Sequence, residues 1–211
     1  MNIYPYYSGH PFIQKLADKH NVRSDNVILG NGSDEIITMV ALAFLSGSDE
    51  VLTGDITFSQ YHFAAQLAGA KFKTVPMIDG GFDCDNILSC ISPATKVIYI
   101  ANPNNPTGTL IDYKRLCAFM EEIPPHVLVV FDEAYYEYVQ DSPDFPDSMA
   151  YRYDNVITLR TFSKAYGLAG VRIGYGFAHH TLIENLMKVK EPFEPSFVAQ
   201  AAGLGALEDM E

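Results

Sequence analysis

The sequence contains no tryptophan, and only three of its 211 residues are cysteines. So few cysteines, irregularly spaced, cannot build a disulfide framework or a cysteine-rich zinc site, and we expect no bound metal. Basic residues are also scarce, with 14 lysines and arginines against 26 acidic residues and a formal net charge of -12. No run of lysine or arginine is long enough to follow a phosphate backbone, which argues against nucleic acid as a partner.

Long hydrophobic runs are lacking too. No apolar stretch reaches the roughly 18 to 20 residues that span a bilayer, so no membrane partner is expected. The first residues lack the basic and then apolar order of a signal peptide. A hydrophobic fraction of 48% with 19% charged residues is ordinary for a globular protein and argues against disorder. We therefore expect a folded cytoplasmic protein.

What the sequence does contain is a regular alternation of short apolar runs and amphipathic segments, which is typical of strands joined by crossover helices. Several runs are apolar on both faces, as in a mostly parallel sheet covered by helices. Seven strands are predicted, at residues 26–30, 50–54, 71–77, 96–102, 126–134, 155–162 and 172–178. Helices are predicted at residues 33–45, 57–69, 111–123 and 180–190. The predicted fold is α/β, with three layers around a mostly parallel seven-stranded sheet.

The pattern divides the chain into three parts. Residues 1–25 lead into a large α/β domain over residues 26–195, and residues 196–211 form the start of a further helix, beginning at about Pro195 or Ser196. A polar, proline-containing connection at residues 140–154 is the only loose stretch. Because the last helix stops with its apolar face still exposed, we expect a further part of the protein to be missing.

The sequence GNGSDE follows the first strand and opens a helix. The unpaired N–H groups of Ser33 and Asp34, at the positive end of the helix dipole, can bind an anion without basic side chains. The same residues also fit an ordinary turn in which Ser33 caps the helix. They lack the G-x-G-x-x-G spacing of a dinucleotide-binding domain, so that interpretation ranks behind the others.

Two further strand ends carry polar side chains. The loop NPNNPTG holds Asn105 at the carboxyl edge of the sheet, where open α/β proteins bind ligands, although a plain proline-rich turn explains the pattern as well. Asp132 directly follows an apolar strand, and a carboxylate buried there needs a cation or several donors. Tyr135, three residues later, can face the same cavity or be structural.

The stretch TFSKAYGLAGVRIGY surrounds Lys164 with hydroxyls and an arginine. A lysine in an apolar environment has a lowered pKa and becomes a nucleophile that forms Schiff bases with aldehydes. The hydroxyls of Thr161 and Ser163 and the guanidinium of Arg172 suit a phosphate dianion. An aldehyde and a phosphate on one molecule describe pyridoxal phosphate, and its pyridinium nitrogen would supply the cation that Asp132 lacks.

Together these motifs resemble the pyridoxal-phosphate-dependent class I and II aminotransferases, and within them most closely the histidinol-phosphate aminotransferase group. The resemblance rests on GNGSDEII, NPNNPTG, VVFDEAYYEY and RTFSKAYGLAGVRIGY in this order, with YPYYSGHPFIQKLA near the start and EPFEPSFVAQAA near the end. It covers nearly the whole chain. It implies the large domain of the aspartate-aminotransferase-like fold, with the family's small C-terminal domain missing.

The resemblance also implies catalytic roles. Lys164 would hold the cofactor as a Schiff base and then move the proton between substrate and cofactor. Asp132 would keep the pyridine nitrogen protonated, and Tyr135 and Asn105 would bond the cofactor's phenolic oxygen. These assignments carry over only because the motif positions match.

Other residues would hold the ring and the phosphate. Phe58 would stack on the ring, with Tyr61 as a competitor for that role. The phosphate would rest on the groups already described as anion-binding, namely Ser33, Asp34, Thr161, Ser163 and Arg172. Tyr4 matches a family tyrosine that reaches the phosphate in the neighbouring subunit, which implies a homodimer with shared sites.

The implied activity interconverts histidinol phosphate and imidazole-acetol phosphate with glutamate and 2-oxoglutarate, as in histidine biosynthesis. The alternatives are an aromatic aminotransferase, a threonine-phosphate decarboxylase, or a non-catalytic cofactor-binding fragment. Because the family's small domain supplies an arginine for the substrate carboxylate, we expect this chain alone to transaminate poorly. Ile56 stands where the family has proline, and Glu194 where it has asparagine. The acid would either weaken the binding of an anionic substrate or face solvent.

Overall fold

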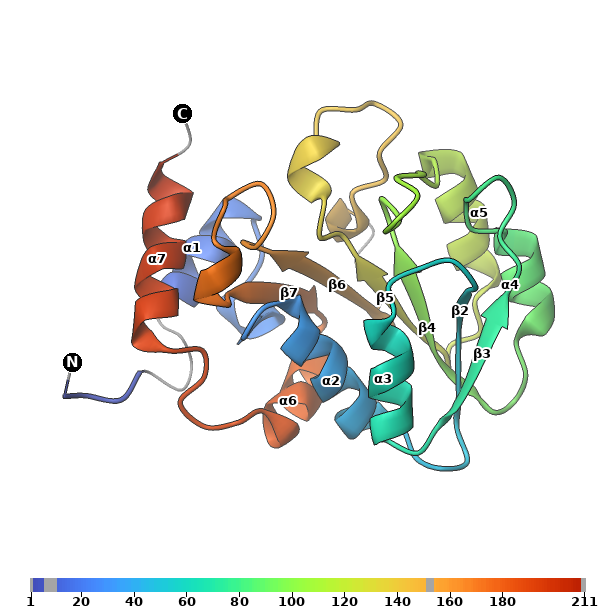
Figure 1. Cartoon of the computed structure of the whole chain (residues 1–211), viewed down its shortest axis with the longest axis horizontal. Helices are drawn as coiled ribbons and strands as arrows, with labels where there is room; N and C mark the ends of the chain where they lie inside the picture. Colours follow the sequence, from blue (N-terminus) through green and yellow to red (C-terminus); the bar gives the residue numbers. More distant parts are fainter. Residues whose placement is uncertain (1, 6–10, 151–153, 210–211) are drawn as a thin grey trace.

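The computed structural model describes residues 2–5, 11–150 and 154–209. Within these ranges lies a seven-stranded sheet in the order β1-β7-β6-β5-β4-β2-β3 (Figure 1). The strands are β1 (Val27–Gly30), β2 (Glu50–Gly54), β3 (Lys71–Val75), β4 (Thr95–Ala101), β5 (Leu128–Asp132), β6 (Val156–Thr161) and β7 (Gly174–Ala178). Strand β7 is antiparallel to both β1 and β6, and the other neighbouring pairs are parallel. The predicted α/β fold is confirmed.

Helices cover both faces of this sheet. One face packs against α2, α3 and α6, and the other packs against α4 and α5, with α1 and α7 at the β1 end. The α-helices are α1 (Phe12–Lys19), α2 (Ser33–Phe44), α3 (Gln60–Leu67), α4 (Cys84–Cys90), α5 (Tyr113–Glu122), α6 (His180–Val189) and α7 (Phe197–Glu208). Short 3-10 turns lie at Ser24–Asn26, Tyr136–Tyr138, Ser148–Ala150 and Ala169–Val171. None of the described helices has the length and apolar character needed to cross a membrane.

Four helices and all seven strands lie within a few residues of their predicted positions, and the last helix begins at Phe197. The sequence did not predict α1 and α4. Helix α4 has only seven residues, too few for a helical period to show, and the Asp83 side chain caps it by accepting a hydrogen bond from the Asn86 amide. Helix α1 lies in the segment that was treated only as an N-terminal lead into the domain.

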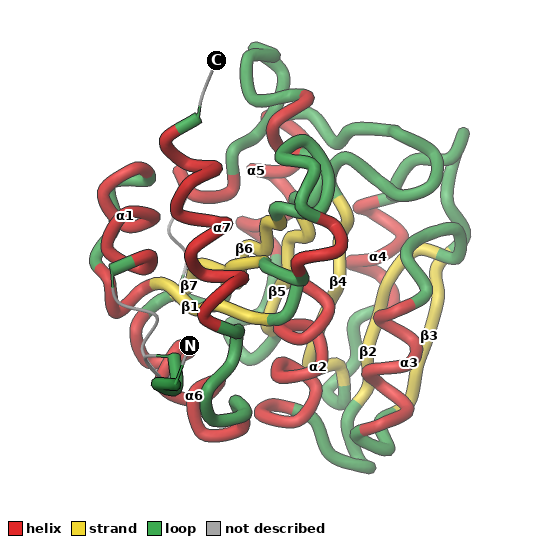
Figure 2. Tube along the Cα trace, turned by 60° about the vertical axis from the view of Figure 1, so that its left-hand side comes forward, coloured by secondary structure: helices red, strands yellow, loops and turns green. Residues whose placement is uncertain are grey.

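Helices α1 and α7, from opposite ends of the chain, lie side by side (Figure 2). Gly203 in α7 makes this approach possible, because a Cβ atom there would lie 2.6 Å from Cζ of Phe12. Phe12 is buried in the cluster that the two helices share with β1 and β7. Phe197 and Val198, on another side of α7, are each 53% exposed. The division of the chain at residues 25 and 195 stays a prediction.

A buried ionic cluster lies on the sheet face opposite α2. The guanidinium of Arg160, which is 0% exposed, donates to Oε2 of Glu133 at 2.8 and 2.9 Å and to Oδ1 of Asp147 at 2.7 Å. Its carbon lies 3.3 Å from the centre of the Tyr136 ring. The amide of Ser148 donates to the other carboxylate oxygen of Glu133.

This cluster corrects the expectation of a loose stretch at residues 140–154. Asp147 and Ser148 from that stretch bind the ionic cluster, and Phe145 is buried. A sequence pattern of polar residues and prolines cannot distinguish a solvated loop from one whose polar groups bind a buried arginine. Residues 151–153 of the stretch lie outside the described residues.

Candidate functional site

The carboxyl ends of β4, β5 and β6 meet the amino end of α2 at a cavity of about 160 Å³. Such a position, where neighbouring parallel strands end, is where open α/β folds bind ligands. Eleven residues singled out in the sequence line this cavity, from five separate motifs of the chain: Ser33, Asp34, Phe58, Tyr61, Asn105, Asp132, Tyr135, Thr161, Ser163, Lys164 and Arg172. Motifs far apart in sequence are thus brought together at one cavity.

Asp132 lies at the deep end of the cavity, 5% exposed at the end of β5. Its Oδ2 atom accepts a hydrogen bond from the Tyr61 hydroxyl at 2.8 Å, and its Oδ1 atom accepts one from the Ala134 amide at 3.2 Å. In the described part of the chain, no lysine, arginine or histidine forms an ion pair with this carboxylate. Burial raises the pKa of Asp132 to about 6, and the Tyr61 hydrogen bond opposes that rise.

The buried Asp132 makes the stability of the fold depend on pH. The folded chain binds the proton of the Asp132 carboxyl more tightly than the unfolded chain does. The stabilisation of the fold by this proton is therefore complete well below the ordinary pKa of 3.8 and is lost as pH rises through about 6. A shift of this size corresponds to about 3 kcal/mol. Between about pH 4 and pH 7.5, urea unfolding of the wild type should lose about 2.5 kcal/mol relative to Asp132→Asn. Parallel pH profiles for the two proteins would contradict the assignment.

Lys164 lies on the open side of the cavity, in the loop that follows β6. Its Nζ atom lies over the Tyr135 ring, 5.5 Å from the ring centre, and both residues line the cavity. The expectation that an apolar environment encloses Lys164 is wrong, because the residue is exposed. The loop carries the lysine past the end of the strand and leaves it uncovered by the residues around it.

The loop that carries Asn105 is fixed by its neighbour Asn104, which is 2% exposed. The Asn104 side chain accepts a hydrogen bond from the Thr57 hydroxyl at 2.7 Å and donates to the Ile56 carbonyl at 2.9 Å. It also donates to the Thr107 hydroxyl at 2.8 Å. Asn104 therefore ties this loop to the segment just before Phe58. No sequence pattern pointed to this role of Asn104, because its partners Thr57 and Ile56 lie in a distant segment of the chain.

The opposite end of the cavity has the groups of an anion site. The N-terminus of α2 at Ser33 has no side-chain cap. Arg172 donates to the Ser163 hydroxyl at 3.3 Å, and its Nη2 atom lies 3.6 Å from the Asp34 carboxylate. The hydroxyl of Thr161 accepts a hydrogen bond from the Ser163 amide at 3.1 Å. Helix amides, two hydroxyls and a guanidinium together suit a phosphate group.

Two glycines allow the backbone segments at this end of the cavity to approach each other closely. Gly32 has φ of 77°, a conformation that residues with a side chain rarely adopt. A Cβ atom on Gly174 would lie 2.3 Å from the Ser33 amide nitrogen, so strand β7 approaches the start of α2 only because this residue lacks a side chain. The glycines therefore bring Arg172 and the helix amides to one place.

The two aromatic candidates for ring stacking differ in their surroundings. Tyr61 is 0% exposed, with its ring stacked on Tyr99 at 4.6 Å between centres and its hydroxyl bonded to Asp132. Phe58 is only partly buried and meets the Tyr61 ring edge-on at 5.7 Å. Both line the cavity, but one face of Tyr61 is already covered.

Three other residues lie away from this cavity. Tyr4 is 74% exposed and stacks on Phe193, with ring centres 4.3 Å apart. Residues 6–10 of the same motif lie outside the described residues. Ile56 is 50% exposed, so the change from proline leaves its side chain at the surface. Glu194 is not among the residues that line the cavity.

Comparison with known proteins gives one family. The model of class I and II aminotransferases matches residues 1–211. A histidinol-phosphate aminotransferase of Geobacillus sp. (strain WCH70) is 44% identical over 209 residues, which are 98% of this chain and 57% of that protein. The corresponding protein of Moorella thermoacetica is 43% identical over 210 residues, 98% of this chain and 54% of its own length.

A solved structure, the histidinol-phosphate aminotransferase of Sinorhizobium meliloti in complex with pyridoxal-5'-phosphate, has a TM-score of 0.92 and 30% identity. The alignment covers 98% of this chain and 56% of that one. This chain thus spans little more than half the length of the relatives it matches. Across its whole length, the chain belongs to the class I and II aminotransferase family.

Proposed function

We propose that this chain binds pyridoxal phosphate and forms the cofactor-binding part of a histidinol-phosphate aminotransferase. The reaction would interconvert histidinol phosphate and imidazole-acetol phosphate, with glutamate and 2-oxoglutarate as the second pair. The observation that carries the proposal is the single cavity lined by Asp132, Lys164 and the anion-binding groups around Arg172. The 41–44% identity to relatives named for this activity supports the choice of substrate.

The residues of the cavity fit this cofactor at both ends. When bound, pyridoxal phosphate supplies an aldehyde that reacts with amines and a ring that accepts electrons. Asp132, a buried acid that accepts hydrogen bonds from Tyr61 and Ala134 and forms no ion pair with a described residue, is suited to hold a proton on the ring nitrogen. The anion site at the other end, with Ser33, Thr161 and Arg172, is suited to the phosphate.

The remaining cavity residues divide the other tasks. The amine of Lys164 would bind the aldehyde carbon and then carry a proton to and from the substrate's Cα atom. Tyr135 and Asn105 would donate hydrogen bonds to the phenolic oxygen. Phe58 would stack on the ring, since Tyr61 has one face on Tyr99 and its hydroxyl on Asp132.

The proposal includes a cytoplasmic homodimer. Tyr4 supports it, because this tyrosine stacks on Phe193 at the surface, is 74% exposed and lies outside the cavity of its own chain, where a second subunit would meet it. The expected substrates are small phosphorylated amino compounds and keto acids. Size-exclusion chromatography with light scattering would measure the oligomeric state, and a strictly monomeric protein with full cofactor affinity would exclude the role of Tyr4.

Covalent trapping tests the proposal. Incubation with pyridoxal phosphate followed by borohydride reduction should attach one cofactor to Lys164, located by peptide mass spectrometry. Lys164→Ala should lose this adduct, whereas Lys188→Ala, which removes an exposed lysine from α6, should keep it. A reduced adduct spread over several surface lysines, equal in both variants, would refute the proposal. Trapping at Lys164 without transfer of the amino group from histidinol phosphate would favour the non-catalytic fragment.

A further inference from the structure

The buried hydrogen bond between Tyr61 and Asp132 has so far been treated only as a contact of the acid, with no role given to Tyr61 itself. We propose that Tyr61 is a positioning residue, whose hydroxyl fixes the Asp132 carboxylate and keeps it ionised so that the acid can hold a proton on the cofactor's ring nitrogen. This inference rests on the proposed function for its purpose, but the contact itself belongs to the chain without cofactor.

The two hydrogen bonds hold the Asp132 carboxylate in place and still leave it able to accept further hydrogen bonds. Tyr61 donates to Oδ2 at 2.8 Å, and the Ala134 amide donates to Oδ1 at 3.2 Å. Each carboxylate oxygen can accept about two hydrogen bonds, so each keeps a lone pair for a further donor. Two donors on different oxygens also prevent the carboxylate from rotating. Asp132 is therefore oriented before any ligand arrives.

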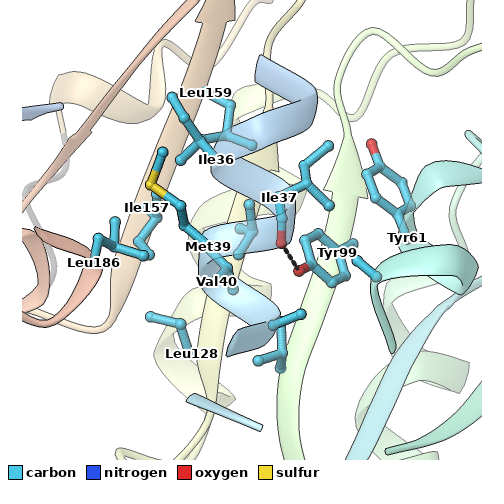
Figure 3. Packing of buried hydrophobic residues seen from close by; sticks show 14 of the residues in the cluster. Ile36, Ile37, Met39, Val40, Tyr61, Tyr99, Leu128, Ile157, Leu159 and Leu186 are labelled. Carbon is cyan, nitrogen blue, oxygen red and sulfur yellow. Dashed lines mark hydrogen bonds between the residues drawn. The ribbon is translucent and has the colours of Figure 1, made fainter. Parts of the chain in front are cut away.

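The Tyr61 side chain is itself held in place. Its ring lies nearly parallel to that of Tyr99, with 5° between the planes and 4.6 Å between the centres. The Tyr99 hydroxyl points at the backbone carbonyl of Ile37 in α2, whereas the Tyr61 hydroxyl points away from it (Figure 3). Phe58 meets the Tyr61 ring edge-on. The hydroxyl therefore cannot swing away from Asp132 without disturbing this stack.

The surrounding charges show why the acid needs such a donor. Burial and the nearby carboxylates of Asp34 and Glu133 raise the pKa of Asp132, while Lys164 lies across the same cavity. The Tyr61 hydrogen bond is the largest effect in the opposite direction, ahead of the Ala134 amide. Burial and the negative charge of Asp132 raise the pKa of Tyr61 itself, so the hydroxyl keeps its proton and remains a donor.

The test measures the titration of Asp132 in the chain without cofactor. Carbon-13 NMR of aspartate carboxyl groups, with Asp132→Asn to assign the resonance, reports the pKa directly. Tyr61→Phe should raise the pKa of Asp132 by about one unit, a roughly tenfold gain in proton affinity, because a charge-assisted hydrogen bond is lost. An unchanged Asp132 titration in Tyr61→Phe would overturn the proposal.

Tyr99→Phe is the matched control. It removes a buried hydroxyl from the stacked neighbour, whose partner is the Ile37 carbonyl at 3.4 Å and not Asp132. The pKa of Asp132 should stay within about 0.2 units of wild type in this variant, well inside the one-unit effect expected above. An equal shift in both variants would mean that loosened packing, and not the hydrogen bond, controls the acid.

A second substitution covers the case in which Tyr61→Phe fails to fold. Incorporation of 3,5-difluorotyrosine at position 61 keeps the shape of the ring and makes the hydroxyl a stronger donor. It should lower the pKa of Asp132, and no change or a rise would overturn the proposal. Failure of cofactor trapping at Lys164 would refute the proposed function alone, since the Asp132 titration is measured without cofactor. Trapping with an unaltered titration would refute only the role of Tyr61.

Discussion

Replacing Glu133 by glutamine should lower the free energy of unfolding by about 3 to 5 kcal/mol, because it leaves the buried guanidinium of Arg160 without its main counter-charge. Glu133 uses one oxygen for Arg160 and the other for the Ser148 amide. Glutamine has a single acceptor oxygen, so its NH₂ group must face one of these two donors. Urea-induced unfolding at neutral pH measures the effect.

The control for this experiment is Glu122→Gln, since Glu122 is exposed at the end of α5. Its effect should stay within about 0.5 kcal/mol. The double variant Glu133→Leu with Arg160→Met should recover much of the loss, because apolar side chains can replace a buried ion pair at little cost. A loss below about 1 kcal/mol for Glu133→Gln would show that Asp147 and Tyr136 alone satisfy Arg160.

Gly174→Ala should reduce the affinity for pyridoxal phosphate at least about tenfold. The new methyl group must displace the backbone at Ser33, and the resulting strain should cost more than about 1 kcal/mol of binding free energy. The Cβ atom would lie 2.3 Å from the Ser33 nitrogen and 2.5 Å from the Gly32 carbonyl carbon. Backbone cannot move aside as a side chain can, so the anion site itself is displaced. Isothermal titration calorimetry measures the change.

Two comparisons separate this effect from general damage. Pyridoxal, which lacks the phosphate, should bind wild type and Gly174→Ala with similar affinity. Gly176→Ala, on the same strand, places its Cβ atom 3.2 Å from a flexible Leu159 side chain and should leave both affinities near wild type. Equal losses for the two ligands in Gly174→Ala would mean that the anion site is not the part affected.

Most of the site was predictable from the sequence because the residues concerned lie at the ends of strands or in the loops that follow them. Asn105, Asp132 and Lys164 each come just after an apolar run, and in a mostly parallel sheet such positions meet at one edge. Their positions after predicted strands were therefore enough to predict that they lie close together at one edge of the sheet. The roles assigned to these residues remain predictions, which the trapping and titration experiments address.

The features that the sequence did not predict depend on contacts between segments that lie far apart in the chain. The hydrogen bond from Tyr61 to Asp132 joins residues 71 positions apart, and the ion pair of Arg160 with Glu133 joins β6 to the residue that follows β5. An arginine inside an apolar strand pattern does not reveal which face it takes or which acid it meets. The exposure of Lys164 likewise depends on which other segments cover its loop.

The pairing of β1 with β7 has a consequence for the order of folding. Gly30 pairs with Gly174, so among the described strands β1 has no partner until synthesis has advanced from residue 30 to residue 174. At ribosomal speeds of about 5 to 20 residues per second, this wait lasts roughly 7 to 30 s. Arg172 is made just before β7, so the proposed phosphate site is completed only at the end of that wait. A nascent chain would thus gain its affinity for the cofactor late, after the parallel strands have already assembled.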